Sequence, residues 1–355
     1  MDSGFSPSRK RWTARTRSCW ALSFMNTSRL GSMFSRMTRK LFDCQRALST
    51  MSWHIFLSTM CWHSTNSLLN ELYAVDNSEP HFRVSDYDPR RTKAFHSFHH
   101  HRYVINREIL DTDVVISLPK LKTHEKVGIT CGLKGFVGAV GHKDCLAHHR
   151  FGSPCVGGDE YPDGSRISLL LSRFHDYVQG QEPKRPFQGV LHVADQFLRR
   201  GTRLVGLVQA GAWSGNDTAW RMALDLSRIL HYADSSGRMQ NAIQRRHLSL
   251  IDGVIGGEEN GPLSPRPADC GTLIFSDNVA AGDSVACRLM GYDIDRVPIV
   301  REAFRKMRYP IADSMDMQNP ICWNGRQVQE GDIPVVLHRP FLPPIGWREH
   351  LISKA

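Results

Sequence analysis

The sequence lacks any pair of cysteines spaced closely enough to form a local metal or redox motif. Its nine cysteines are scattered, and no two stand in a Cys-x-x-Cys arrangement. This spacing excludes zinc ribbons and ferredoxin-type clusters as local motifs, so no iron–sulfur cofactor is expected in this chain. An odd cysteine count in a chain of 355 residues also argues against a disulfide framework. A reducing cytoplasm is therefore the simplest compartment.

The sequence also lacks a long uninterrupted apolar run. Its most apolar stretch, residues 47–62, is broken by serine, threonine and histidine. That stretch is too short and too polar to span a bilayer. No apolar region follows the early arginines in the order that a secretory signal requires. We therefore expect no membrane partner.

Acidic residues are scarce in residues 1–47, where only Asp2 and Asp43 occur beside ten Lys/Arg. This segment therefore accounts for eight of the ten net positive charges of the chain. A nucleic-acid-binding domain would spread its charge through the folded part, so no nucleic-acid partner is expected. The segment has the composition of a transit peptide, a basic tail or an upstream reading frame. Residues 1–95 show no sustained period. We predict that they are poorly ordered or are not genuine family sequence.

Four histidines follow in a dense tract: His96, His99, His100 and His101. A metal site is one interpretation, because imidazole is a common metal ligand. Adjacent residues of a strand point to opposite faces, however, and so rarely share an ion. The tract is therefore interpreted as a solvated linker.

Strand and helix patterns alternate between residues 102 and 310. Strands are predicted at 113–118, 203–209, 247–252 and 271–276, and amphipathic helices at 166–180, 217–234 and 279–290. This alternation predicts an α/β fold whose mostly parallel sheet carries helices on both faces. The domain is expected to span 96–310, with a C-terminal extension at 311–355.

Cations gather directly after the first of these strands. Lys120, Lys122, His124 and Lys134 follow it in sequence. Open parallel sheets bind ligands at the carboxyl ends of their strands, so this cluster predicts a pocket for a small anion. Lys120, Lys122 and Lys134 would stabilise the ligand charge. His124 is the candidate acid/base because its ordinary pKa lies near neutrality. The alternative is that the lysines form a solvated loop.

Polar side chains also follow the other predicted strands. Asn216 and Asp217 follow the second strand and are candidate ligand-binding residues. The later strands supply candidate ligands of a divalent metal ion: Asp252, Glu258, Asp277 and Asp283. Asp252 is also a candidate catalytic residue that would orient His124. The alternative for Asp277 is a plain helix cap.

Four runs in order resemble the family known as domain of unknown function 362. They are DVVISLPKLKTHEKVGITCGLKGFVG, GNDTAWRMALDLSRILHYAD, LSLIDGVIGGEENGPLSP and SDNVAAGDSVACRLMGYD, within about 111–300. The family's motifs fall on Pro119, Lys120, Lys122, His124, Leu133, Lys134, Ile251, Asp252, Gly253, Gly261, Pro262, Asp277 and Asp283.

The resemblance does not imply a particular activity, because the family has no general assigned one. Some members are associated with ferredoxin modules, which this chain lacks. The chain departs from the pattern at Asp277-Asn278, where Asp-Pro is usual, and it has no Lys-Pro-Asn run in residues 1–100. We expect a protein that binds a small anionic ligand, with its chemical transformation left open. The alternatives are a non-catalytic binding or scaffold protein and a truncated gene product that lacks the first strand.

Overall fold

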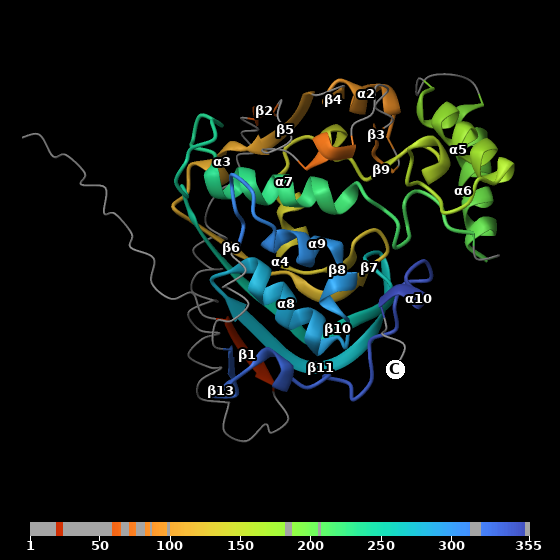
Figure 1. Cartoon of the computed structure of the whole chain (residues 1–355). Coiled ribbons are helices and arrows are strands. Elements are labelled where there is room, and N and C mark those ends of the chain that lie inside the picture. The colour runs from red at the N-terminus through yellow and green to blue at the C-terminus, as the bar shows by residue number, and fades with distance from the viewer. Residues whose placement is uncertain are drawn as a thin grey trace, which may run out of the picture.

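The chain folds around one long β-hairpin. In a computed structural model, residues 19–23, 59–64, 71–75, 82–85, 87–97, 100–181, 187–204, 207–312 and 321–351 are described. The hairpin consists of β10 (Arg246–Asn260) and β11 (Ser264–Ser276). It forms the centre of an eight-stranded sheet of order β13-β12-β1-β11-β10-β7-β8, in which β6 also pairs with β10 (Figure 1).

The remaining strands of this sheet are short. They are β1 (Cys19–Ser23), β6 (Val114–Ser117), β7 (Lys120–His124), β8 (Gly128–Thr130), β12 (Ile321–Trp323) and β13 (Arg326–Val328). A second sheet contains β2 (Thr59–Ser64), β4 (His96–Ser97) and β5 (His100–Asn106), and a third pairs β3 (Phe82–Arg83) with β9 (His149–Arg150).

Glycines explain why the stretch 253–262, which the sequence predicts to be a loop, is mostly strand. β7 crosses β10 so closely that side chains would not fit. A Cβ at Gly253 would lie 2.8 Å from Leu121 Cδ2, and one at Gly257 would lie 3.0 Å from Lys122 Cβ. The register of β10 with β11 also shifts between Gly253 and Ile255. These glycines therefore admit a neighbouring strand rather than shape a turn.

The sheet is mixed rather than mostly parallel. β10 pairs in parallel with β6 and β7, and β1 does so with β12, whereas the other four pairings are antiparallel. Only residues 261–263 connect β10 to β11, and so short a connection permits only an antiparallel pair. The carboxyl ends of these two strands consequently lie at opposite edges of the sheet. The polar residues that follow the predicted strands therefore do not all lie at one edge, as they would in a parallel sheet.

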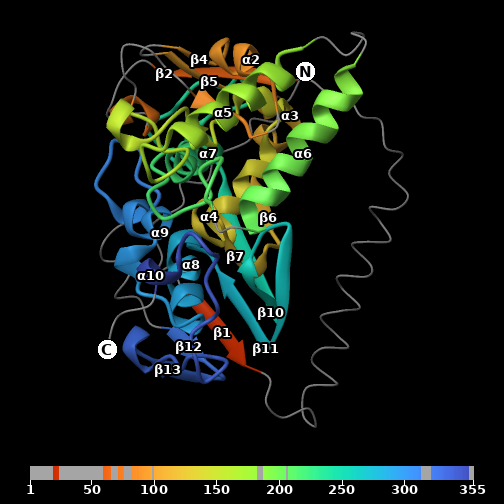
Figure 2. The ribbon, with the colours of Figure 1, turned by 90° about the vertical axis from the view of Figure 1, so that its right-hand side faces the viewer.

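Helices α8 (Val279–Leu289) and α4 (Gly132–Gly135) contact the sheet on one face, with α9 (Pro298–Arg301) and α7 (Ala219–Tyr232) beyond them (Figures 1 and 2). The predicted second helical layer is not seen among the described residues. On the opposite face Val114, Ile116 and Phe275 remain exposed, with Ile116 at 63 %.

Three predicted helices are confirmed as α5 (Arg166–Gln179), α7 and α8. The strand predicted at 203–209 is wrong, because residues 203 and 204 end the helix α6 (Gln188–Leu204) and residues 207–209 form no strand. A short apolar run at the end of a helix cannot be told from a strand by periodicity alone. The smaller helices are α2 (Pro89–Lys93), α3 (Arg107–Leu110) and α10 (Arg348–Leu351).

The histidine tract is part of the core. His96 and His101 are fully buried on β4 and β5, with their Nδ1 atoms 3.3 Å apart. The Nε2–H of His96 donates to the Cys145 carbonyl at 2.7 Å. Burial, followed by repulsion from His101, lowers the pKa of His96 to about 3. The linker interpretation is therefore wrong for these two residues, while His99 lies outside the described residues.

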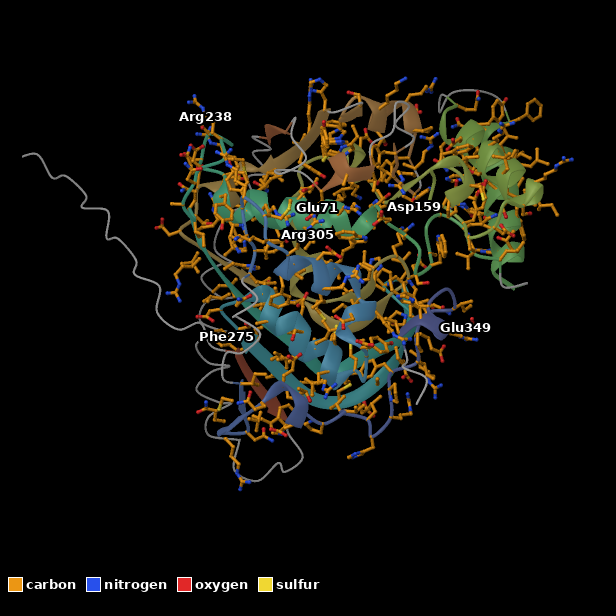
Figure 3. The ribbon with its side chains drawn as sticks, in the orientation of Figure 1. Glu71, Asp159, Arg238, Phe275, Arg305 and Glu349 are labelled. Atoms are coloured by element: carbon orange, nitrogen blue, oxygen red, sulfur yellow. The ribbon has the colours of Figure 1, made fainter. Side chains whose placement is uncertain are left out.

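A buried ion network fixes a segment that the sequence predicts to be outside the fold. Glu71 Oε1 lies 2.8 Å from Arg228 Nη2, and both side chains are almost fully buried. Arg305 pairs with the other oxygen of Glu71 (Figure 3). The Glu71 N–H donates to Asp225 Oδ1 at 2.7 Å, and the Tyr103 hydroxyl donates to Oδ2 at 3.1 Å. Parts of residues 1–95 thus belong to the fold.

We predict that Glu71→Gln lowers the free energy of unfolding by about 3 kcal/mol, because the buried Arg228 loses its nearest counter-charge and keeps only the longer contact of 3.8 Å with Asp225. Asp111→Asn is the matched control. It breaks the exposed pair with Arg107, 3.4 Å apart, and should cost about 0.5 kcal/mol or less. Urea unfolding of both variants measures the difference. Equal effects would show that the network contributes no more than a surface pair.

Candidate functional site

Three of the four carboxylates predicted to hold a metal, Asp252, Glu258 and Asp283, have different partners within the protein. Arg339 binds both oxygens of Glu258 at 2.9 Å. Although burial opposes ionisation, these hydrogen bonds and that of the Leu342 N–H hold the pKa of Glu258 below its ordinary value. Asp277 directly follows β11, and it therefore lies at the edge of the sheet opposite to the carboxyl end of β10. Asn278, not Asp277, caps α8. The described residues contain no group of three or more His, Cys, Asp or Glu that could hold a metal ion.

Lys120 and Asp252 pair with each other. Lys120 Nζ donates to Asp252 Oδ2 at 2.7 Å, and both side chains are nearly half exposed. Asp252 lies in the middle of β10 rather than after it. The pair satisfies both charges, and its exposure limits its contribution to stability. A catalytic role for Asp252 stays a prediction.

Asn216 and Asp217 have structural partners. Asn216 is buried, and its Oδ1 accepts from Thr218 N and Ala219 N at the start of α7. Its Nδ2 donates to the His148 carbonyl at 2.9 Å, which ties the loop carrying His148 to this helix. Asp217 pairs with Arg221 at 3.0 Å. Their predicted ligand contacts remain untested.

The other predicted cations converge with two further residues into what we call the basic cluster: Lys122, His124, Lys126, Lys134 and His148. Lys122 and His124 share one face of β7, Lys134 comes from α4, and His148 precedes β9. His124, Lys126 and Lys134 are at most 8 % exposed. Lys122 Nζ donates to the Pro262 carbonyl at 3.2 Å, and Lys126 Nζ donates to the Ala210 carbonyl.

The basic cluster contains only lysines and histidines, so its ionisable groups repel one another when they are charged. Burial lowers the pKa of His124 well below its ordinary value, and repulsion from Lys134 and Lys126 adds to this shift. Burial, followed by repulsion from Lys126, lowers the pKa of Lys134 to about 8. No carboxylate of the described residues forms an ion pair with Lys134. Lys134 is therefore a buried positive charge without a carboxylate partner among the described residues.

Hydrogen bonds fix which nitrogen of each histidine carries the proton. His124 Nδ1 accepts from the Lys126 backbone N–H at 3.0 Å, so the proton of the neutral ring lies on Nε2. His148 Nδ1 lies 2.8 Å from the Leu146 carbonyl, which can only accept, so His148 Nε2 has a free lone pair. The cluster thus contains one imidazole donor and one imidazole acceptor beside its lysines.

The buried Asp283 positions the segment that carries Lys134. Its two oxygens accept from Gly132 N at 2.7 Å and Leu133 N at 2.9 Å. A Cβ at Gly132 would lie 2.5 Å from Val279 Cγ1, so only glycine fits this contact. Asp283 thus joins α8 to the first residues of α4, and burial raises its pKa to about 7. These hydrogen bonds give Asp283 a structural role in α8 that does not require a metal ion.

Sequence reasoning missed two members of the cluster as site residues. Lys126 belongs to the same cationic run as Lys120, and that run was the available signal. His148 had no signal, because its place depends on how Asn216 and the 142–150 loop pack.

The chain belongs to the family described as domain of unknown function DUF362, whose match covers residues 71–288. The match begins before residue 96, where the sequence places the start of the domain. Searches of the curated proteins and of the solved structures each found no match. Among the described helices, none has the length and apolar character needed to cross a bilayer.

We predict that Asp283 makes stability depend on pH. Its folded pKa of about 7 exceeds the ordinary value of 3.8, so the folded chain binds this proton more tightly than the unfolded chain does. The ionised carboxylate is therefore penalised above pH 7, and the penalty disappears as the pH falls toward 3.8. Asp283→Asn does not titrate. The parent-minus-variant difference in unfolding free energy should rise as the pH falls through this window, by at most about 1.4 kcal/mol per unit.

Urea unfolding of parent and variant at a series of pH values measures this difference. A parent-minus-variant difference that stays flat between pH 7 and 4 would contradict the raised pKa.

Proposed function

We propose that the protein binds a small anion, or the anionic end of a larger ligand, in the basic cluster. The observation that carries the proposal is Lys134, a residue only 8 % exposed that has no carboxylate partner among the described residues. Burying an unpaired charge is costly. An anion beside Lys134 would supply the counter-charge that this side chain lacks among the described residues.

The chemistry of the cluster favours an oxyanion that also carries a hydroxyl group. The lysines and His124 Nε2–H would donate to negatively charged oxygens. His148 Nε2 would accept from the hydroxyl. A phosphate monoester or a hydroxycarboxylate has both features. If the ligand is transformed, His124 and His148 are the groups placed to exchange a proton with it.

We predict that phosphate or citrate raises the melting temperature of the parent, because a ligand that binds only the folded state stabilises it by mass action. Lys134→Met keeps the aliphatic chain and removes the charge, so it should abolish most of the anion-induced shift. Without anion the variant should be at least as stable as the parent, since a penalised charge is gone.

Lys143→Met is the matched control, because Lys143 is an exposed lysine of the same region. It should keep the full shift. If Lys134→Met responds to anions as the parent does, the cluster is not the binding site.

Anion binding should also weaken at alkaline pH. Lys134 has a pKa of about 8, so its charge is present below pH 8 and is lost above it. Sulfate is a suitable probe because its own charge is constant in this range. Its Kd, measured by calorimetry, should be steady below pH 8 and rise above it in the parent. In Lys134→Met the Kd should already be high at neutral pH and change less. A parent Kd that is flat from pH 7 to 10 would refute the role of Lys134.

A further inference from the structure

The helices α5 and α6 expose an apolar surface. They pack against each other at the side of the molecule (Figures 1 and 2). Seven large apolar side chains on and beside them are between 52 % and 78 % exposed. They are Ile167, Leu170, Tyr177, Phe187, Val190, Val193 and Phe197, which we call the hairpin face.

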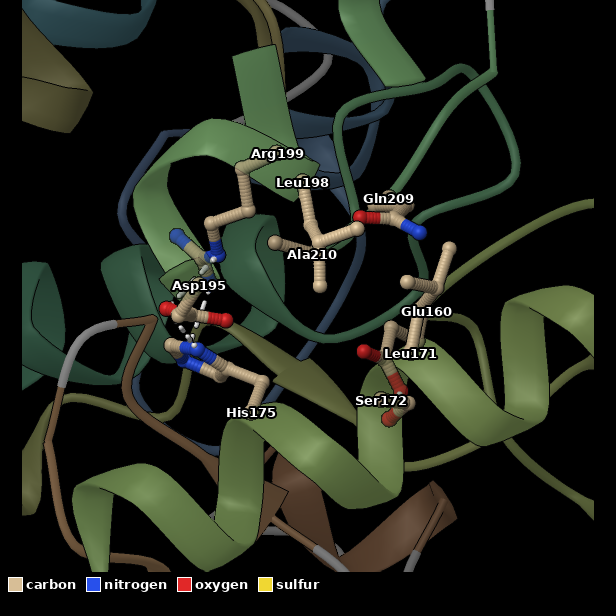
Figure 4. A pocket seen from close by; sticks show the side chains of 9 residues that line it. All are labelled: Glu160, Leu171, Ser172, His175, Asp195, Leu198, Arg199, Gln209 and Ala210. Atoms are coloured by element: carbon tan, nitrogen blue, oxygen red, sulfur yellow. Dashed lines mark hydrogen bonds and ion pairs between the residues drawn. The ribbon is translucent and has the colours of Figure 1, made fainter. Parts of the chain in front are cut away.

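The opposite, buried side of the same helices carries several polar groups. His175 Nδ1 lies 2.9 Å from Asp195 Oδ2, and His175 Nε2 lies 2.8 Å from Arg199 Nη2 (Figure 4). The Ser172 hydroxyl donates to Glu160 at 2.6 Å. The cavity between these groups has room for about one water molecule. Polar contacts therefore help to hold the helices on the body, while seven large apolar residues point outward, which is unusual for a surface helix.

The charge on the exposed side has one sign. Arg166, Arg173 and Arg200 are exposed, and none forms an ion pair with a described residue. The two acids within the described parts of the helices are engaged on the inner side, where Asp176 pairs with Arg83 at 3.0 Å and Asp195 pairs with His175. Exposed arginines beside exposed aromatic and aliphatic residues match an anionic apolar boundary.

We propose that the hairpin face binds the surface of an anionic lipid bilayer, with its apolar side chains in the headgroup region and its arginines on lipid phosphates. The helices would lie on the membrane without crossing it. This peripheral contact differs from the sequence-based expectation of no membrane partner. Charge favours it over a second copy of the chain, since a symmetric dimer would bring the same arginines together.

The test is co-sedimentation of the full chain with phosphatidylcholine vesicles, with and without phosphatidylserine, at physiological salt. The parent should bind the anionic vesicles more strongly. Val193→Asp with Phe197→Asp should reduce that binding at least about tenfold, because two apolar anchors are lost. Replacing Arg166, Arg173 and Arg200 with Gln should reduce it by about fivefold per arginine and weaken its dependence on salt.

Two controls make the result specific. Residues 1–47 are strongly basic and are the same in every variant, so any contribution they make to vesicle binding cancels and only differences between variants count. Ile116→Asp alters an equally exposed apolar residue on the sheet and should bind as the parent does. Circular dichroism and the anion-induced melting shift check that each variant is folded. The proposal is overturned if the double Asp variant binds like the parent. It is also overturned if light scattering shows a dimer that this variant dissociates, which would identify a second copy as the partner.

Discussion

The close crossing of β7 over the glycines of β10 is the constraint on which the candidate site depends. Gly253 and Gly257 allow β7 to lie against β10 where any side chain would collide. This contact sets the position of Lys122 and His124, because both project from β7. β10 is also the partner of β6 and β11, so the same strand aligns the centre of the sheet with the cations. A substitution at either glycine would disturb the fold and the basic cluster together.

The charges of the site divide into those that are satisfied within the protein and those that are not. Glu258 is neutralised by Arg339, and Asp252 is paired with Lys120. Asp283 accepts two backbone N–H groups. Carboxylates with such partners are poor metal ligands, since binding an ion would break these contacts. Lys134 has no carboxylate partner in the part of the chain that the structure describes, and this asymmetry favours an anionic ligand over a cationic one.

The sequence allowed the long helices and most members of the cationic cluster to be predicted, because each leaves a local signal. Helix periodicity identified α5, α7 and α8, and the lysine spacing after β6 identified Lys122 and Lys134. The direction of β11 could not be predicted in the same way. The sequence predicts a strand only over 247–252, whereas β10 continues to Asn260. The glycines of this continuation are required by β7, which is more than a hundred residues away. His148 and the pairings of Asp252 and Glu258 likewise depend on contacts between distant segments, which a single sequence does not report.

The segment 209–210 connects the basic cluster with the helices α5 and α6. The Ala210 carbonyl accepts a hydrogen bond from Lys126 Nζ, while Gln209 and Ala210 also line the small cavity beneath α5 and α6. Ala210 adopts a positive φ of 53°, a conformation that costs energy for a residue with a side chain. A residue held in this way is fixed by its neighbours on both sides. Ala210 thus takes part both in the contacts beneath α6 and in the hydrogen bond of Lys126. A shift of either region would therefore displace this residue and affect the other region.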